Sequence, residues 1–166
     1  MTNGNVYIRQ TGLVNPDNLT MPISIIGAGG IGSWSSLALS KMGCSNITVY
    51  DFDSVEEHNL GSQIYSHTDI GELKVVALKS KLNLITGNSI NISPARMTNL
   101  YQNVLTDIVI LAVDNIETRT KIYQTLIKED VLLIDGRMAG NAIEIYTCKM
   151  NDMIQCKAYE KTLFTP

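Results

Sequence analysis

Three glycines follow a short apolar run in the pattern GxGxxG, at Gly27, Gly29 and Gly32. Glycines with this spacing permit a tight turn, let the backbone approach a phosphate, and allow a helix to pack closely on the strand before it. The free amides of the first helical turn would then face the phosphates of a nucleotide. A bare GxGxxG is a weak signal, but here an apolar run precedes it and helical spacing of apolar residues follows it. The pattern therefore favours a nucleotide-binding turn over glycines that serve only close packing.

Three charged residues follow at positions that suit a nucleotide site. Asp51 ends a β-rich run about 20 residues beyond the glycines, where a carboxylate can accept hydrogen bonds from a ribose. Asp114 ends a near-continuous apolar run, which is typical of a buried parallel strand. Lys74 lies near the start of a predicted helix, where a cation meets an unfavourable dipole unless an anion lies nearby. A phosphate would remove that conflict, although a single lysine is also an ordinary surface residue.

The elements that must position these residues alternate between strand and helix. Strands are predicted at residues 23–26, 47–50, 88–93, 107–113 and 131–134, and helices at residues 31–42, 69–85, 98–105 and 116–128. A last strand at 142–147 has no long crossover before it, so we expect it to pair antiparallel as a hairpin. We therefore predict an α/β fold with a doubly wound, mostly parallel, Rossmann-like sheet and an antiparallel strand near the C-terminus. Ligands of such sheets bind at the carboxyl ends of the strands.

Length and composition describe one domain of ordinary globular character. The chain has 166 residues, of which 45% are hydrophobic and 17% charged, and its net charge is −3. That charge disfavours nucleic acid, which usually needs a basic face. No window approaches the ~20 apolar residues of a membrane span, and the N-terminus lacks the layout of a signal peptide. We therefore expect a cytoplasmic protein without nucleic-acid or membrane partners. We divide it into an arm over residues 1–20, a nucleotide-binding domain over 21–150 and a tail over 151–166.

The spacing of the cysteines and histidines does not indicate a disulfide framework or a metal site. The cysteines, at positions 44, 148 and 156, are odd in number and form no close CxxC pair, which argues against a disulfide framework and a four-cysteine zinc site. Cys148 and Cys156 could pair, and Cys156 could act as a nucleophile, but no obvious base lies near it in the sequence. His58 and His67 lack the spacing of metal ligands.

Taken together, these motifs resemble those of the ubiquitin-activating-like superfamily, most closely its bacterial ThiF/MoeB-type members. The sequence reads GAGGIG from Gly27, DFDSV from Asp51, NLGSQ from Asn59, GELK from Gly71 and DNIETR from Asp114, with YIRQ from Tyr7 in the arm. The resemblance extends from the arm to about Gly140. It implies a ThiF-like domain over residues 21–150 that uses ATP to adenylate the C-terminus of a small ubiquitin-like or sulfur-carrier protein.

The resemblance also implies roles for single residues. ATP would be held by Gly27, Gly29, Gly30, Gly32, Asp51, Asp53, Asn59 and Lys74. Arg9, Lys74 and Asp114 would act in catalysis, the first two at the phosphates and Asp114 as the ligand of Mg²⁺. An acceptor carboxylate is already ionised at neutral pH and needs no general base, so catalysis would rest on positioning and charge neutralisation. The family arrangement further implies a homodimer.

Two features depart from the family pattern. Ser62 stands where the family carries an arginine supplied across the dimer, and such an arginine can be worth about 10³ to 10⁵ in rate. Arg119 and Arg137 are the candidates to replace it. The zinc-binding CxxC pair and the catalytic cysteine of many relatives are also missing, so the sequence does not support thiol transfer.

Two other function classes stay open. The chain could be a non-catalytic nucleotide-binding subunit or scaffold that keeps the fold without the arginine. It could also be a nicotinamide-dependent oxidoreductase, since the glycine turn and Asp51 fit that class equally well. Against the oxidoreductase, the strand ends offer no candidate proton donor, and a dinucleotide site does not require Lys74 or Asp114.

Overall fold

The computed structural model describes residues 6–10, 12–95, 106–127 and 129–163. Six strands form one sheet in the order β3-β2-β1-β4-β5-β6. They are β1 Ile23–Ile26, β2 Ile47–Tyr50, β3 Asn91–Ser93, β4 Ile108–Leu111, β5 Leu132–Ala139 and β6 Ala142–Lys149. All neighbours pair in parallel except β5 and β6, which are antiparallel. The predicted sheet, mostly parallel with an antiparallel strand near the C-terminus, is confirmed.

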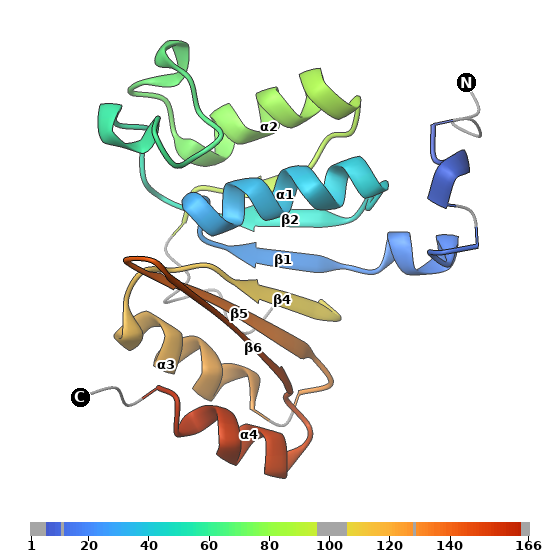
Figure 1. Ribbon diagram of the computed structural model, residues 1–166, viewed down its shortest axis with the longest axis vertical. Helices are drawn as coiled ribbons and strands as arrows, with labels where there is room; N and C mark the ends of the chain where they lie inside the picture. Colours follow the sequence, from blue (N-terminus) through green and yellow to red (C-terminus); the bar gives the residue numbers. More distant parts are fainter. Residues whose placement is uncertain (1–5, 11, 96–105, 128, 164–166) are drawn as a thin grey trace.

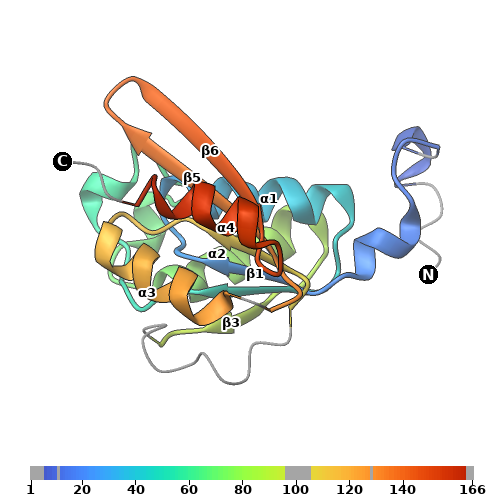
Figure 2. The ribbon, with the colours of Figure 1, turned by 90° about the horizontal axis from the view of Figure 1, so that it is seen from below.

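Helices cover both faces of the sheet (Figure 1, Figure 2). They are α1 Gly30–Met42, α2 Lys74–Thr86, α3 Ile116–Leu126 and α4 Met153–Glu160. One hydrophobic cluster joins Ile25 and Val49 of the sheet to Leu78 of α2, while a second joins Leu111 and Leu133 to α3 and α4. Since side chains alternate between the two faces of a strand, these clusters are the two layers of a doubly wound fold.

The strand, turn and helix at the start of the domain follow the predicted pattern. All four residues of β1 are buried, as expected for a central parallel strand. Helix α1 ends where predicted, because Gly43 adopts a φ of 99° and its N–H donates to the carbonyls of Leu39 and Ser40. The glycine turn therefore lies between two fixed elements.

Helix α2 differs from the prediction, because it begins at Lys74 and not at residue 69. The Asp69 carboxylate accepts a hydrogen bond from the Ser66 N–H at 2.6 Å and closes a short 3₁₀ turn. Gly71, with a φ of 88°, then interrupts the helical path. Lys74 thus becomes the first residue of α2, at the positive end of its dipole.

The C-terminal part is more ordered than the sequence predicts. Strand β5 runs through Gly136 and pairs with β6 along its whole length, because the hairpin supplies hydrogen bonds that a local apolar pattern does not reveal. The segment expected as a tail over residues 151–166 contains α4, whose Cys156 and Tyr159 are buried. The helix predicted at 98–105 lies outside the described residues. No helix within the described ranges has the length and apolar character needed to cross a membrane.

Candidate functional site

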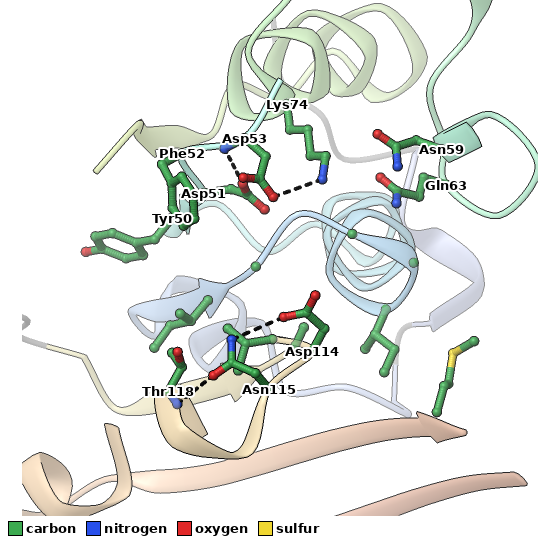
Figure 3. A pocket seen from close by; sticks show the side chains of 18 of the residues that line it. Tyr50, Asp51, Phe52, Asp53, Asn59, Gln63, Lys74, Asp114, Asn115 and Thr118 are labelled. Carbon is green, nitrogen blue, oxygen red and sulfur yellow. Dashed lines mark hydrogen bonds and ion pairs between the residues drawn. The ribbon is translucent and has the colours of Figure 1, made fainter. Parts of the chain in front are cut away.

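A cleft of about 730 Å³ opens at the carboxyl ends of β1, β2 and β4. The predicted site residues that line it are Gly27, Gly29, Gly30, Asp51, Asp53, Asn59, Lys74 and Asp114 (Figure 3). This volume is within the usual range for small-molecule and cofactor sites. The fold thus brings together residues from four separate segments at the edge where α/β sheets bind ligands.

Two glycines of the turn are required by the packing of the protein itself. Gly27 has a φ of 100°, and a methyl group on it would lie 2.5 Å from the Ala112 carbonyl oxygen. A methyl group on Gly32 would lie only 1.8 Å from the Gly27 carbonyl oxygen. Gly32 is accordingly buried beneath the turn and is not part of the cleft lining.

The other two glycines are not explained by packing. A methyl group on Gly29 would have the Gln63 Nε2 atom, at 3.9 Å, as its nearest neighbour, and one on Gly30 would have the Ser62 carbonyl oxygen at 3.8 Å. Both glycines line the cleft. The N-terminus of α1 has no side-chain cap, so its first amides are available to an anion. This arrangement leaves space and donors for a phosphate.

Asp51 connects the end of β2 to the glycine turn. Its Oδ2 atom accepts a hydrogen bond from the Ala28 N–H at 2.6 Å, and its Oδ1 atom accepts one from the Asp53 N–H at 2.8 Å. Burial raises the pKa of the Asp51 carboxyl, an effect that these two backbone donors only partly offset. Each oxygen has a further lone pair that a ribose hydroxyl can use.

Lys74 is held by a carboxylate of the protein. Its Nζ atom lies 3.3 Å from the Asp53 Oδ2 atom, and its side chain is only 10% exposed, whereas that of Asp53 is 50% exposed. Asp53 thus relieves the conflict between this cation and the α2 dipole. A phosphate in the cleft would compete with Asp53 for the same ammonium group.

The loop over residues 59–63 forms the rim above α1. Asn59 is buried, and its Oδ1 atom accepts a hydrogen bond from the Glu56 N–H at 2.9 Å. Ser62 is exposed, and its carbonyl oxygen accepts a hydrogen bond from the Trp34 Nε1–H at 2.9 Å. Gln63 also lines the cleft, although the sequence analysis does not name it as a site residue. The feature that could have indicated it is its position at the end of the family motif NLGSQ.

Asp114 follows β4 and is exposed at the mouth of the cleft. Its Oδ1 atom accepts a hydrogen bond from the Asn115 Nδ2–H at 3.3 Å, and Asn115 in turn caps α3 by accepting from the Thr118 N–H. Within the described ranges, no three Asp, Glu, His or Cys side chains form a group that could bind a metal. A single carboxylate fits Mg²⁺, which is commonly held by one or two carboxylates together with phosphates and water.

Arg119 and Arg137 line the cleft but are engaged by the protein. Arg119 forms a buried ion pair with Asp135 and donates to the carbonyl oxygens of Val113 and Gly136. Arg137 donates from Nε to the Asp135 Oδ2 atom at 2.8 Å, and its other nitrogens donate to the carbonyl and hydroxyl oxygens of Thr162. These contacts join the loop that carries Asp114 to β5 and to the segment after α4. The sequence does not indicate a role for Asp135. One of its partners, Arg119, is far from it along the chain, and the other, Arg137, lies near it but in no recognisable motif.

Arg9 is not brought to the cleft. The arm that carries it lies at the other end of α1 (Figure 1), where Gln10 Nε2 donates to the Met42 carbonyl at 2.7 Å and the Tyr7 ring packs against Gly43. A helix of this length, 13 residues, extends about 20 Å. Arg9 is therefore too distant to contact a ligand in the cleft of its own chain.

Cys148 and Cys156 are free, and both are buried in the core between β6 and α4. Their Sγ atoms lie 3.8 Å apart. Burial, with a further contribution from Cys156, raises the pKa of the Cys148 thiol to about 12. Neither thiol lines the cleft, so neither is placed to attack a ligand there.

The model of the ThiF family matches residues 17–162. The chain belongs to the ThiF family. Its resemblance to the ubiquitin-activating-like superfamily, which the motifs indicate, is thereby confirmed.

Curated relatives of this ThiF-family chain carry several names. The tRNA threonylcarbamoyladenosine dehydratase of Haemophilus influenzae is 34% identical over 137 residues, which are 75% of this chain and 52% of the relative. The adenylyltransferase and sulfurtransferase MOCS3 of Culex quinquefasciatus is 31% identical over 129 residues, which are 74% of this chain and 28% of the relative. The chain thus spans about half of these relatives' length or less.

Solved structures share the fold of this ThiF-family chain. The Escherichia coli tRNA N6-threonylcarbamoyladenosine dehydratase in complex with ATP matches with a TM-score of 0.74 and 22% identity, over 83% of this chain and 61% of that one. E. coli MccB with AMPCPP and MccA matches with a TM-score of 0.72 and 21% identity, over 99% of this chain and 57% of that one. At such identities the likeness concerns the fold alone.

Proposed function

We propose that this ThiF-family chain binds ATP with Mg²⁺ and adenylates the C-terminal carboxylate of a small ubiquitin-like or sulfur-carrier protein or peptide. The observation that carries the proposal is the meeting of Gly29, Asp51, Lys74 and Asp114 in one cleft whose glycines leave room for a ligand. Relatives named as an adenylyltransferase and as ubiquitin-like modifier-activating enzymes support the reaction class. Related structures that contain ATP, or AMPCPP with MccA, support the nucleotide and the kind of acceptor.

In this proposal each part of the cleft has one task. Asp51 accepts the ribose hydroxyls, while Gly29, Gly30 and the first amides of α1 surround the phosphates. Lys74 exchanges Asp53 for a phosphate oxygen. Asp114 holds Mg²⁺, which neutralises phosphate charge when it is bound.

The proposed chemistry needs no proton transfer from the protein. An oxygen of the acceptor carboxylate forms a bond to the α-phosphorus while the bond from that phosphorus to the bridging oxygen breaks, and pyrophosphate leaves with the electron pair. The acceptor carboxylate is ionised at neutral pH, so the residues of the cleft position the reactants and balance charge.

The charges of the cleft argue for a second copy of the chain. The lining carboxylates are Asp51, Asp53, Glu56 and Asp114, whereas the lining Lys and Arg residues are Lys74, Arg119 and Arg137. Each of these three cations is already ion-paired with a carboxylate of the protein. Among the residues that the structure describes, the cleft therefore offers a triphosphate no Lys or Arg that is not already ion-paired. We propose a cytoplasmic homodimer in which Arg9 of one copy serves the cleft of the other.

The same pairing of cations favours one alternative, a non-catalytic nucleotide-binding subunit or scaffold. Ser62 carries no charge, and neither Arg119 nor Arg137 is free to replace the family arginine without breaking its bonds to Asp135. Such a protein would bind ATP but would not form an adenylate.

Two measurements test the proposal and separate it from its alternatives. ATP with Mg²⁺ should raise the melting temperature and NAD should not, since ligand binding stabilises the folded state by mass action. Stabilisation by NAD that equals or exceeds that by ATP would favour the oxidoreductase. Exchange of labelled pyrophosphate into ATP, measured with candidate small acceptor proteins, reports adenylation directly. Binding of ATP without exchange for any acceptor would favour the scaffold.

A further inference from the structure

Two side chains hold the middle of the glycine turn by its backbone. The Ala28 N–H donates to the Asp51 Oδ2 atom at 2.6 Å, and the Ala28 carbonyl oxygen accepts a hydrogen bond from the Tyr65 hydroxyl at 2.7 Å. Both Ala28 and Tyr65 are buried. The peptide units before and after Ala28 are therefore each held by one side chain, Asp51 at the end of β2 and Tyr65 just after the rim loop.

The hydrogen bond from Tyr65 determines which way the next amide points. A trans peptide unit is planar, so its C=O and N–H groups point in opposite directions. The Ala28 carbonyl points to Tyr65, which belongs to the hydrophobic cluster between the sheet and α2, so the Gly29 N–H points away from that cluster. Gly29 lines the cleft and begins α1 without a side-chain cap. Its amide is thus available to a ligand in the cleft.

This orientation needs a fixed partner because the residue after the peptide unit is glycine. A peptide unit reverses by rotation about ψ of the residue before it and φ of the residue after it, and glycine adopts φ values of either sign at little cost. The Tyr65 hydroxyl is suited to prevent that rotation. Burial, together with the carboxylates of Asp51 and Asp69, raises the pKa of Tyr65, so the hydroxyl keeps its proton and remains a donor.

We propose that Tyr65 is a positioning residue of the nucleotide site, whose hydroxyl fixes the peptide unit between Ala28 and Gly29 so that the Gly29 N–H faces the phosphates. Tyr65 acts from the core and makes no contact with the nucleotide. It favours binding because the amide is oriented before the ligand arrives. The inference rests on the proposed function, because it takes the cleft to bind a nucleotide.

The variant Tyr65→Phe tests this role, since phenylalanine keeps the ring and lacks only the hydroxyl. Its Kd for ATP with Mg²⁺ and its Kd for pyrophosphate should each rise about three- to tenfold, while its Kd for adenosine should change by less than about twofold. The matched control is Tyr123→Phe, which removes a buried hydroxyl that donates to the Cys156 carbonyl at 3.1 Å in the other hydrophobic cluster. Both variants should lower the melting temperature, but Tyr123→Phe should leave all three Kd values unchanged.

The Gly29 amide can also be observed directly by NMR of protein that contains ¹⁵N-labelled glycine. Its resonance is identified by its loss in Gly29→Ala. Saturating pyrophosphate should shift this resonance in the parent and in Tyr123→Phe, and should shift it clearly less in Tyr65→Phe, because the amide no longer faces the phosphates in every molecule. An equal shift in all three proteins would show that the amide does not depend on Tyr65 and would overturn the inference.

Each other result decides a different point. A lower melting temperature of Tyr65→Phe with unchanged Kd values for ATP and pyrophosphate would make Tyr65 a purely structural residue and overturn the inference. Equal losses for ATP and adenosine would place the effect on the nucleoside, through Asp51, and also overturn it. A parent that binds pyrophosphate but not ATP would overturn the proposed function, while the effect of Tyr65→Phe on pyrophosphate affinity would still decide the role of Tyr65. A parent that binds neither probe would overturn both.

Discussion

At the scale of single residues, the four glycines of the turn meet two different demands. Gly27 and Gly32 leave no room for a side chain because the backbone of the protein itself occupies that space. Gly29 and Gly30 have room for a methyl group and still lack one. Sequence alone cannot separate these cases, since GxGxxG has the same letters at every glycine. The distinction leads to opposite expectations for two similar substitutions.

Gly29→Ala should lower the unliganded melting temperature much less than Gly32→Ala does, because its methyl group meets no close atom. Its ATP affinity should fall at least about tenfold, since the methyl group would take the space that we propose for a phosphate. Gly32→Ala should instead lower the free energy of unfolding by about 3 kcal/mol or more through overpacking. Thermal unfolding and calorimetric titration measure the two effects. A similar loss of stability in both variants would contradict the division.

Asp114→Ala should abolish the Mg²⁺ dependence of the ATP-induced rise in melting temperature, because it removes the proposed metal ligand and disturbs no core contact of this exposed residue. Asp107→Ala is the matched control, because Asp107 is exposed just before the opposite end of β4. It should retain the full dependence. If Asp114→Ala also retains it, the metal is held elsewhere.

At the scale of elements, the sequence predicts the ends of helices and strands best where no side-chain hydrogen bond competes with the local pattern. The end of α1 at Gly43 and the buried strand β1 follow from such signals. The start of α2 does not, because the Asp69 side chain bonds to the Ser66 backbone and replaces the helical path that the apolar pattern favours. The buried ion pair between Arg119 and Asp135 could not be predicted, since it joins α3 to β5, which only the fold brings together.

Asp69 also connects the turn before α2 to the helix itself. Its Oδ2 atom lies 2.7 Å from the Lys81 Nζ atom as well as accepting from Ser66. Burial raises the pKa of Asp69, but the hydrogen bonds from Lys81 and Ser66 outweigh that effect, and the pKa lies below its usual value. Because the folded pKa is below the unfolded one, the stabilisation is present above about pH 4 and is lost as the pH falls through the folded pKa.

Asp69→Asn should therefore lower the free energy of unfolding by about 1–3 kcal/mol at pH 7, since it weakens hydrogen bonds that involve a charge. The difference from the parent should shrink below about pH 4. Urea denaturation at pH 7 and at acid pH measures both values. Glu117→Gln, which alters an exposed ion pair with Lys121, should have little effect at either pH. If Asp69→Asn lowers the free energy of unfolding equally at both pH values, the loss comes from altered packing and not from the charge of Asp69.

At the scale of the whole molecule, the described part of one chain forms the cleft, and each Lys and Arg that lines it there is already ion-paired. If the rim loop reaches the cleft of a second copy in a symmetric dimer, Ser62 can neither span the distance nor carry charge. Ser62→Arg should then leave ATP affinity within about threefold but accelerate adenylate formation, because the added cation would favour the transition state more than bound ATP.

Single-turnover formation of the acyl-adenylate by the parent and by Ser62→Arg, with the same acceptor, measures this effect. Thr68→Arg is a suitable control, because it adds the same charge at another exposed position of the chain. A Ser62→Arg variant no faster than the parent would mean that Arg119 or Arg137 already fills the role, or that the rim loop does not reach a neighbouring cleft.

The place of the arm at the far end of α1 has a consequence for how such a protein would respond to dilution. Since the arm lies at the end of α1 away from the cleft, the proposed role of Arg9 at the phosphates requires the cleft of a neighbouring copy. The rate per chain would then depend on how many chains are paired, and it would fall steeply once the concentration drops below the dissociation constant of the dimer. Abundance, and not only the supply of ATP or acceptor, would set the specific activity.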